Sequence, residues 1–382
     1  MRVNPVAPAS SSPVRIRRVA TYPGIRVLTW HGAFLYASRK YQVVRMKARV
    51  DDLQRIDENT QWEPVARFNT VWWRCQTSRT KIGFRLVRDG FHALAIYCDG
   101  DEDGDCTMIG AIPGAIITRA PACEDFKMTH EIRRGTRPLH LTAVPGGRIY
   151  WGEYFDNRER AAVHIYASVD QGQTWQVAYT FPARSIRHVH NIVYDRWANC
   201  LWILTGDEGA ECKVLRADCN LSSVEEVLGG NQQARAVAAI PTPDALYLAT
   251  DTPFEENHIV RLDRRGDVAA IANLPSSSTF GCRVSEAIFF STMVEPSAVN
   301  TSRDVHLIGS IDGSEWQALA CWRKDKLPMR YFQYGNIILP DGDNTTNYLA
   351  ATTIAVERDD LTTSLWEVES SARTPQQGRP SL

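Results

Sequence analysis

The chain has 382 residues, 44% of them hydrophobic, and a formal net charge of −1 with a sequence pI near 6.8. A charge this close to zero creates no global field that would recruit nucleic acid or an anionic membrane, so we expect neither as a partner. No apolar run reaches the roughly 18 residues that span a bilayer, and the first residues lack the apolar core of a secretory signal. We therefore expect a cytoplasmic protein without a membrane span, either a monomer or a weak oligomer.

Nine cysteines are scattered along the chain without a C-x-x-C pair. An odd number with no regular spacing argues against a disulfide framework. In a cytoplasmic protein such residues are usually reduced and pack as small apolar side chains. We predict reduced, mostly buried cysteines.

The chain begins with residues 1–13, which are rich in Pro, Ser and Ala, and we expect a disordered tail there. Residues 14–22 then have the pattern of a strand with no partner close in sequence. Groups of strand-like segments separated by turn residues follow at 32–68 and 81–112. No segment has a convincing helical period, which argues against an α/β fold.

The third group, residues 137–175, has the clearest pattern, and its last turn has the sequence SVDQGQTW. Ser168, Asp170, Gly172, Thr174 and Trp175 stand there in the order S-x-D-x-G-x-T-W. In such a turn the carboxylate accepts backbone N–H groups and the glycine takes a positive φ. We interpret the turn as a structural staple between two strands. A degenerate copy, SIDGSEW, recurs at 310–316.

Arginines mark a sustained period along the rest of the chain. They stand before or at the first strand of successive groups, 50, 48, 48 and 47 residues apart: Arg137, Arg187, Arg235, Arg283 and Arg330. Such a period, with four short strands in each unit, is typical of β-propeller blades. We predict an all-β fold, a single seven-bladed β-propeller of four-stranded blades over residues 14–368. A disordered tail should follow at 369–382; six or eight blades are the alternatives.

The seventh group is one strand short at its end. The unpaired strand at 14–22 should complete it, so that the N-terminal strand closes the ring and removes the open sheet edge.

Polar residues collect in the loops that, in a propeller, share one face around the central channel. Fixed guanidiniums there would suit a carboxylate because each is a planar bidentate donor. Alternatively, one arginine per blade could form salt bridges to the neighbouring blade. The substrate-binding candidates are Arg137, His140, Arg187, Gln233, Arg235, Arg283, Arg330 and Gln333.

The catalytic candidates lie in the same loops, because histidines can move protons near neutral pH and paired carboxyl groups cleave glycosides. They are His188, His190, Glu153, Asp207, Asp251 and Tyr154. On a strand, His188 and His190 point to the same face. With His140 and Gln232 they could bind a divalent metal ion, the only cofactor that the motifs suggest. A hydrogen-bonded His pair, and carboxylates that only neutralise arginines, are the alternatives.

The SVDQGQTW turn is identified as an Asp-box, the bacterial neuraminidase repeat of the sialidase superfamily. Together with GEYFDN, IRHVH, TGD, NQQARA and TDTP, it makes residues 130–356 resemble bacterial sialidase-like or glycosyl-hydrolase-like propellers. The resemblance implies the propeller fold and a carbohydrate ligand. The His and Gln ligand types are similar to the manganese site of oligogalacturonate lyases, which are also propellers. The chain has no FRIP-type sialidase motif near its N-terminus.

We therefore expect a carbohydrate-active propeller that cleaves an acidic, uronate- or carboxylate-bearing oligo- or polysaccharide. The reaction would be hydrolysis or β-elimination. The alternative is a non-catalytic glycan-binding or scaffold propeller in polysaccharide metabolism, and a third reading is a protein-interaction propeller.

Overall fold

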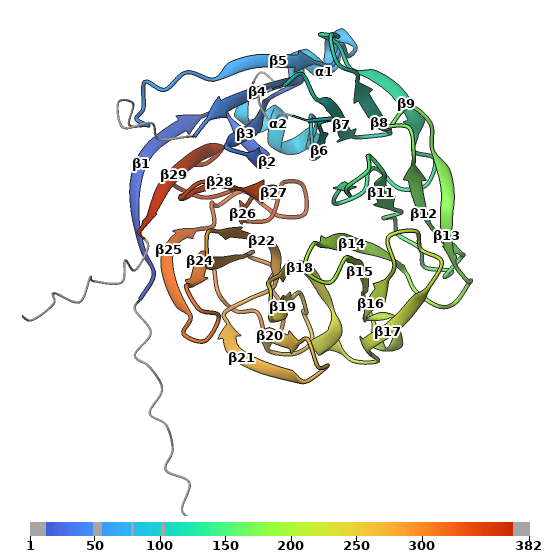
Figure 1. The fold of residues 1–382 in the computed structure, drawn as a ribbon. Coiled ribbons are helices and arrows are strands. Elements are labelled where there is room, and N and C mark those ends of the chain that lie inside the picture. The colour runs from blue at the N-terminus through green and yellow to red at the C-terminus, as the bar shows by residue number, and fades with distance from the viewer. Residues whose placement is uncertain (1–12, 49–55, 78–79, 101–103, 370–382) are drawn as a thin grey trace, which may run out of the picture.

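The computed structural model describes residues 13–48, 56–77, 80–100 and 104–369. Within these ranges the chain forms seven sheets arranged in a ring around a central channel (Figure 1). The predicted seven-bladed β-propeller is therefore confirmed. Of the two predicted tails, only Pro13 and Glu369 lie among the described residues.

Blades 2 to 6 each contain four consecutive strands, from the channel to the outer edge. Blade 2 contains β6 (Ala93–Tyr97), β7 (Thr107–Ile112), β8 (Ala115–Arg119) and β9 (Lys127–Glu131). Blade 3 contains β10 (Thr142–Ala143), β11 (Ile149–Gly152), β12 (Val163–Ser168) and β13 (Gln176–Phe181). Blade 4 contains β14 (His188–Asp195), β15 (Cys200–Gly206), β16 (Lys213–Ala217) and β17 (Val224–Gly229). Blade 5 contains β18 (Ala236–Pro241), β19 (Ala245–Thr250), β20 (Asn257–Asp263) and β21 (Val268–Leu274). Blade 6 contains β22 (Ser278–Val284), β23 (Ala287–Thr292), β24 (Asp304–Ser310) and β25 (Gln317–Arg323).

Blades 1 and 7 form the seam of the ring. Blade 1 contains β2 (Arg26–Gly32), β3 (Phe34–Arg39), β4 (Gln42–Lys47) and β5 (Glu63–Arg67), and β27 (Asp341–Asn344) pairs in parallel with β2. Blade 7 contains β26 (Asn336–Ile338), β28 (Tyr348–Ile354), β29 (Thr362–Glu369) and, at its outer edge, β1 (Arg15–Pro23). β1 pairs with β29 from Arg15↔Glu369 to Pro23↔Thr362. The N-terminal strand thus closes the ring as predicted.

The predicted strand at the start of residues 81–112 is wrong, because the chain forms two short helices there. α1 (Trp72–Thr77) and α2 (Lys81–Val87) are inserted between blades 1 and 2. The side chain of Thr80 caps α2 by accepting the Gly83 N–H at 3.1 Å. Arg85 is fully buried and its guanidinium pairs with the carboxylates of Asp325 and Asp360. Asp325 and Asp360 lie in loops of blades 6 and 7. The ion pairs therefore hold α2 against these loops, and the segment does not join a sheet as a strand. Two 3₁₀ turns lie in connections between strands: η1 (Gly209–Glu211) between β15 and β16, and η2 (Gln232–Ala234) between β17 and β18.

The Asp-box forms the turn between β12 and β13. Asp170 Oδ1 accepts the N–H groups of Gln173 (3.1 Å) and Thr174 (2.9 Å), and Oδ2 accepts the Thr174 hydroxyl at 2.5 Å. Gly172 has φ +82°, and a Cβ on it would come within 2.8 Å of Ile109 in blade 2. Trp175 packs edge-on against Trp151, with ring centroids 6.3 Å apart. The turn therefore fastens blade 3 to blade 2, as a structural staple should.

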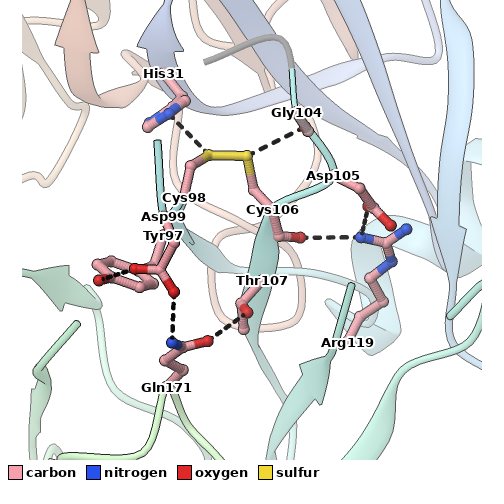
Figure 2. Close-up of a disulfide and its surroundings, with 10 residues drawn as sticks. All are labelled: His31, Tyr97, Cys98, Asp99, Gly104, Asp105, Cys106, Thr107, Arg119 and Gln171. Carbon is pink, nitrogen blue, oxygen red and sulfur yellow. Dashed lines mark hydrogen bonds and ion pairs between the residues drawn. A yellow bond between two sulfur atoms is a disulfide. The ribbon is translucent and has the colours of Figure 1, made fainter. Parts of the chain in front are cut away.

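Cys98 and Cys106 form a disulfide at the end of the β6–β7 hairpin, so the expectation that all cysteines are reduced is wrong (Figure 2). The last residue pair of this ladder is Tyr97↔Thr107. The two cysteines therefore face each other one position further on, with their Cα atoms 4.5 Å apart, the spacing of a non-hydrogen-bonded antiparallel pair. Six further cysteines are free: Cys123, Cys200, Cys212, Cys219, Cys282 and Cys321, of which Cys200, Cys212 and Cys282 are buried.

The described part of the chain contains no helix that is both long and apolar enough to cross a membrane.

We predict that Asp170→Ala lowers the free energy of unfolding by about 1–2 kcal/mol, because it leaves two turn N–H groups without their acceptor. Burial alone would raise the pKa of Asp170, but hydrogen bonds from Thr174 and Ser168 lower it. Its contribution should therefore be present above about pH 4 and be lost as the pH falls further. Urea denaturation at pH 7 and pH 3 measures both effects.

Asp312→Ala in the degenerate Asp-box is the matched control, since Asp312 accepts one close N–H at 2.9 Å and a second at 3.3 Å. Asp312→Ala should lower the free energy of unfolding by less than Asp170→Ala does. An Asp170→Ala variant as stable as the wild type would show that the turn is no staple.

Candidate active site

Blades 4 and 5 bring the strongest group of candidates together at one mouth of the channel. His188 begins β14 and pairs with Gly206 at the end of β15, directly before Asp207. Arg235 directly precedes β18, whose first residue pairs with Thr250, directly before Asp251. Starts of inner strands and ends of second strands share one face of a propeller, so the topology delivers these side chains to the same place. We call Arg187, His188, His190, Asp207, Arg235 and Asp251 the blade 4–5 cluster.

The two histidines face each other across 3.1 Å between their Nε2 atoms. The Nδ1 of His188 lies 3.0 Å from the carbonyl oxygen of Phe155, and the Nδ1 of His190 lies 3.0 Å from that of Ala236. Because a carbonyl oxygen only accepts, each Nδ1 carries a hydrogen. Both Nε2 atoms approach Asp207 Oδ1, at 3.3 Å from His188 and 3.1 Å from His190. The prediction that His188 and His190 share one face is confirmed.

Two guanidiniums contact the same carboxylate from the other side. Arg187 donates to Asp207 Oδ2 at 3.1 Å, and Arg235 lies 3.3 Å from Asp207 Oδ1. The same Arg235 nitrogen lies 3.5 Å from Asp251 Oδ2. Arg235 therefore joins the two carboxyl groups, as the salt-bridge alternative expects. Three polar atoms of the cluster are nevertheless buried and without a hydrogen-bond partner among the described residues: the Nε of Arg187, the Nε of Arg235 and the Oδ1 of Asp251.

The two carboxyl groups have opposite pKa shifts. Burial raises the pKa of Asp251 to about 7, with Glu295 and Asp207 adding to the rise and Arg235 opposing it. Burial also acts to raise the pKa of Asp207, but hydrogen bonds and charge from His188 and His190 lower it well below its ordinary range. Near neutral pH, Asp207 is therefore ionised while Asp251 exchanges its proton readily. Paired groups with separated pKa values are the usual arrangement for an acid and a base.

Tyr154 stands beside the histidines, with its ring centroid 4.3 Å from that of His188. Burial raises the pKa of Tyr154, and the charges of Asp207 and Asp251 raise it further. The phenol is thus a neutral hydroxyl at physiological pH. It is suited to donate a hydrogen bond and poorly suited to act as an anionic nucleophile.

The residues that could hold a divalent metal ion are only partly those predicted. The ligand atoms of His188, His190 and Asp207 all lie within 4.8 Å of one another. Each histidine turns Nε2 inward while its Nδ1–H is held by a carbonyl, which is how metal-binding histidines are oriented. Gln232 is not in the set because its amide already donates to Asp207 O at 3.0 Å and accepts from Thr252 at 2.7 Å. His140 is not in it either.

Three predicted residues do not join the cluster. His140 lies within the channel, 2.9 Å from Asp341 of β27. Arg283 stands near the end of β22, on the opposite face, with Glu286 at 3.3 Å and its guanidinium 5.0 Å from the Trp197 ring. The prediction that Arg283 lies at the same mouth is wrong. Arg283 is the sixth of the seven residues of β22, so it lies at the far end of that strand.

Glu153 does not join the cluster because its carboxylate pairs with Arg134 and accepts the His164 N–H at 2.8 Å.

The remaining candidates lie in the loops that precede the inner strands of blades 3, 5 and 7. Arg137 donates to the carbonyl of Arg88 at 3.1 Å, and Gln233 contacts Glu255 at 2.9 Å and His258 at 3.0 Å. Arg330 and Gln333 lie in the loop before β26, where Arg330 is exposed over Tyr331.

Arg26 was missed by sequence reasoning. It begins β2, and its guanidinium lies 3.3 Å from His92 Nδ1, just before β6. The arginine period, continued backwards from Arg137, does not lead to Arg26, because the inserted helices α1 and α2 lengthen the interval between blades 1 and 2.

A cavity of about 670 Å³ occupies the channel away from the cluster. The ends of the inner strands line it, and it contains His140, Trp197 and Arg283 but none of His188, His190 and Asp207. We place the candidate chemistry at the cluster because the perturbed acid–base groups are there. The cavity is a separate feature of the opposite face.

Comparison with known proteins supports the fold alone. No family model matches the chain, and no curated protein matches it. A chain in the crystal structure of the mitotic checkpoint complex aligns with a TM-score of 0.54 and 13% identity, covering 97% of this chain and 99% of that chain. A chain of a nidogen/laminin complex aligns with a TM-score of 0.48 and 10% identity, over 82% and 98% of the two chains. The first likeness agrees with a seven-bladed propeller; the second is too weak to argue from.

We predict that Asp207→Asn lowers the free energy of unfolding by about 3 kcal/mol at pH 7, because it removes the carboxylate that two mostly buried guanidiniums share. The pKa of Asp207 is lowered in the fold, so this difference from the wild type should shrink as the pH falls below about 4. Thermal or urea unfolding across that range measures it.

Asp156→Asn is the control, since exposed Asp156 also pairs with Arg187, at 2.6 Å. Its unfolding midpoint should barely move. Equal effects of the two substitutions would contradict a special role for Asp207.

Proposed function

We propose that this propeller cleaves a glycan that carries carboxylate groups, using the blade 4–5 cluster. The observation that carries the proposal is the pair Asp251 and Asp207, which share Arg235 and have opposite pKa shifts. A carboxyl group with a pKa near 7 is matched to proton transfer at neutral pH. We assign Asp251 as the proton donor to the leaving-group oxygen.

The unpartnered atoms of the cluster support a ligand at this mouth. Buried polar atoms without a hydrogen-bond partner are rare in native proteins, and three of them lie together here. The Nε–H groups of Arg187 and Arg235 would donate to an acidic sugar, and the Oδ1 of Asp251 would face the glycosidic oxygen. Asp207 already neutralises much of the charge of Arg187 and Arg235. The substrate carboxylate would therefore compete with Asp207 for these guanidiniums without displacing it.

Aromatic side chains on the same face suit a sugar ligand. Phe254 follows β19 and is 61% exposed, while Tyr331, before β26, is 56% exposed. Flat apolar rings with exposed faces can pack against the C–H faces of sugar rings, and large exposed aromatics commonly mark binding surfaces. The sialidase-like resemblance of the Asp-box region points to the same class of ligand.

We also propose that His188, His190 and Asp207 hold a divalent metal ion. Two imidazole Nε2 atoms and one carboxylate oxygen, 3.1–3.3 Å apart, fit a small transition-metal ion. The nearby charges of Arg187 and Arg235 oppose it. A bound ion would act as a Lewis acid on an oxygen of the substrate. Without it, a histidine of the pair that is neutral, with its hydrogen on Nδ1, could accept a proton at Nε2, as β-elimination would need.

The pH dependence of cleavage should follow Asp251. If its protonated form is the acid, kcat/KM on an acidic polysaccharide should fall as the pH rises above about 7. Asp251→Asn should lower kcat by about 10²–10⁴. Unsaturated, ultraviolet-absorbing products would identify β-elimination, and new reducing ends without them would identify hydrolysis.

The same substitution should stabilise the fold at high pH. Folding raises the pKa of Asp251 from 3.8 to about 7, so the wild type loses stability as the pH rises between these values. At pH 8 Asp251→Asn should be more stable by about 4 kcal/mol, at about 1.4 kcal/mol per pKa unit. At pH 4 the two proteins should unfold alike. A variant that is less stable at pH 8 would contradict the raised pKa.

Arg235→Lys tests whether the Arg235 guanidinium binds the carboxylate of the substrate. Lysine keeps the charge but loses the planar fork, so kcat/KM or affinity should fall about ten- to a hundredfold. The loss should be smaller for the same glycan after carboxyl reduction. Arg283→Lys, on the opposite face, is the matched control and should bind like the wild type. Equal affinity for acidic and carboxyl-reduced glycan would end the carboxylate proposal, and binding without any cleavage would favour the scaffold alternative.

A further inference from the structure

A second group of metal-binding side chains lies at the opposite mouth from the blade 4–5 cluster. His31, near the end of β2, places its Nε2 3.1 Å from the Sγ of Cys98, which is bonded to Cys106 (Figure 2). The imidazole comes from blade 1 and the two sulfurs come from blade 2. All three ligand atoms lie within 4.8 Å of one another. We call His31, Cys98 and Cys106 the thiol site.

The disulfide is not needed to hold its hairpin together. Five residue pairs from Ala93↔Ala111 to Tyr97↔Thr107 join β6 and β7, and every residue of β7 is buried. The disulfide joins two residues with a sequence separation of 8. They follow and precede two strands that are already joined by this ladder. Its reduction should therefore leave the blade folded and the two thiols side by side.

Among the described residues, the two sulfurs and the imidazole of His31 form the candidate donor set. The described flanking carboxylates have other partners: Asp99 contacts Tyr97 and Gln171, while Asp105 contacts Arg119 (Figure 2). Asp105 also accepts the Ala122 N–H. His31 and Cys98 are partly exposed and line the channel cavity, so an ion could reach the site from solvent. Two thiolates and an imidazole are the ligands that zinc prefers, at about 2.3 Å for sulfur and 2.0–2.1 Å for nitrogen.

We propose that the reduced thiol site binds a zinc ion and that the disulfide form does not. A dithiol reductant would give two electrons and two protons to the S–S bond, forming the thiols of Cys98 and Cys106 and a disulfide of the reductant. Zinc would then displace the two thiol protons and bind both sulfurs and the Nε2 of His31. Its fourth position would face the channel cavity. The site is thus a metal centre gated by the thiol–disulfide state, and it is independent of the glycan proposal.

Cobalt is the probe, because thiolate-to-cobalt charge transfer absorbs in the near ultraviolet while nitrogen and oxygen ligands at the blade 4–5 cluster produce no such band. The full chain is reduced, freed of reductant without air, and titrated with Co²⁺, followed by displacement with Zn²⁺. We expect one equivalent of thiolate-bound cobalt in the reduced protein and none in the oxidised protein. Cys98→Ser and Cys106→Ser should lose the band, and Cys321→Ser, at an exposed free cysteine, should keep it.

His31→Ala separates the metal site from a simple thiol pair. It keeps both sulfurs, and we expect its zinc affinity to fall at least tenfold, since even partners outside the ligand set contribute 10–100-fold. Unchanged affinity would overturn the assigned ligand set. Absence of the band in the reduced wild type, or its persistence in Cys98→Ser, would overturn the site itself.

Alkylation of the wild type gives a readout that needs no variant. After reduction, zinc should protect Cys98 and Cys106, but not Cys321, from a thiol reagent, as measured on peptides by mass spectrometry. Equal labelling of all three cysteines with and without zinc would contradict the proposal.

Discussion

The pairing of β1 with β29 is the interaction on which the rest of the molecule depends. It joins the two ends of the propeller through the register Arg15↔Glu369 to Pro23↔Thr362, so the first strand of the chain completes the last blade of the ring. The blade 4–5 cluster depends on this closure, because its contacts cross a blade boundary. His190 and Asp207 belong to blade 4, while Arg235 and the Ala236 carbonyl belong to blade 5. The distances between these groups are kept only while blade 4 packs against blade 5.

The fold could be predicted because its signals are local and repeated. The Asp170 turn and the arginine period each identify a blade without knowledge of any distant contact. The helix α2 could not be predicted in this way, because its buried Arg85 is held by Asp325 and Asp360, more than two hundred residues later. The disulfide was missed because the spacing rules for cysteines do not record that Cys98 and Cys106 end two paired strands.

The places of the candidate residues could be predicted where the position on a strand determines them. They could not be predicted where the direction of the side chain determines them. His188, His190, Asp207 and Asp251 follow from their places at the ends of inner and second strands. Arg283 shares the period of the other arginines but lies at the far end of its strand, and a shift of a few residues along an inner strand exchanges one face for the other. Glu153 is in a suitable loop, yet Arg134 and the His164 N–H hold its carboxylate elsewhere. Such competition between partners is set by three-dimensional contacts that a single sequence does not display.

The register of β1 also fixes where the chain joins the ring. Arg15, near the first described residue, lies opposite Glu369, the last, at the outer edge of blade 7. The polypeptide thus arrives and departs at one point on the perimeter, far from the channel axis (Figure 1). A surface, a label or a second protein attached through either end would approach the disc from its side. Both openings of the channel would then stay accessible.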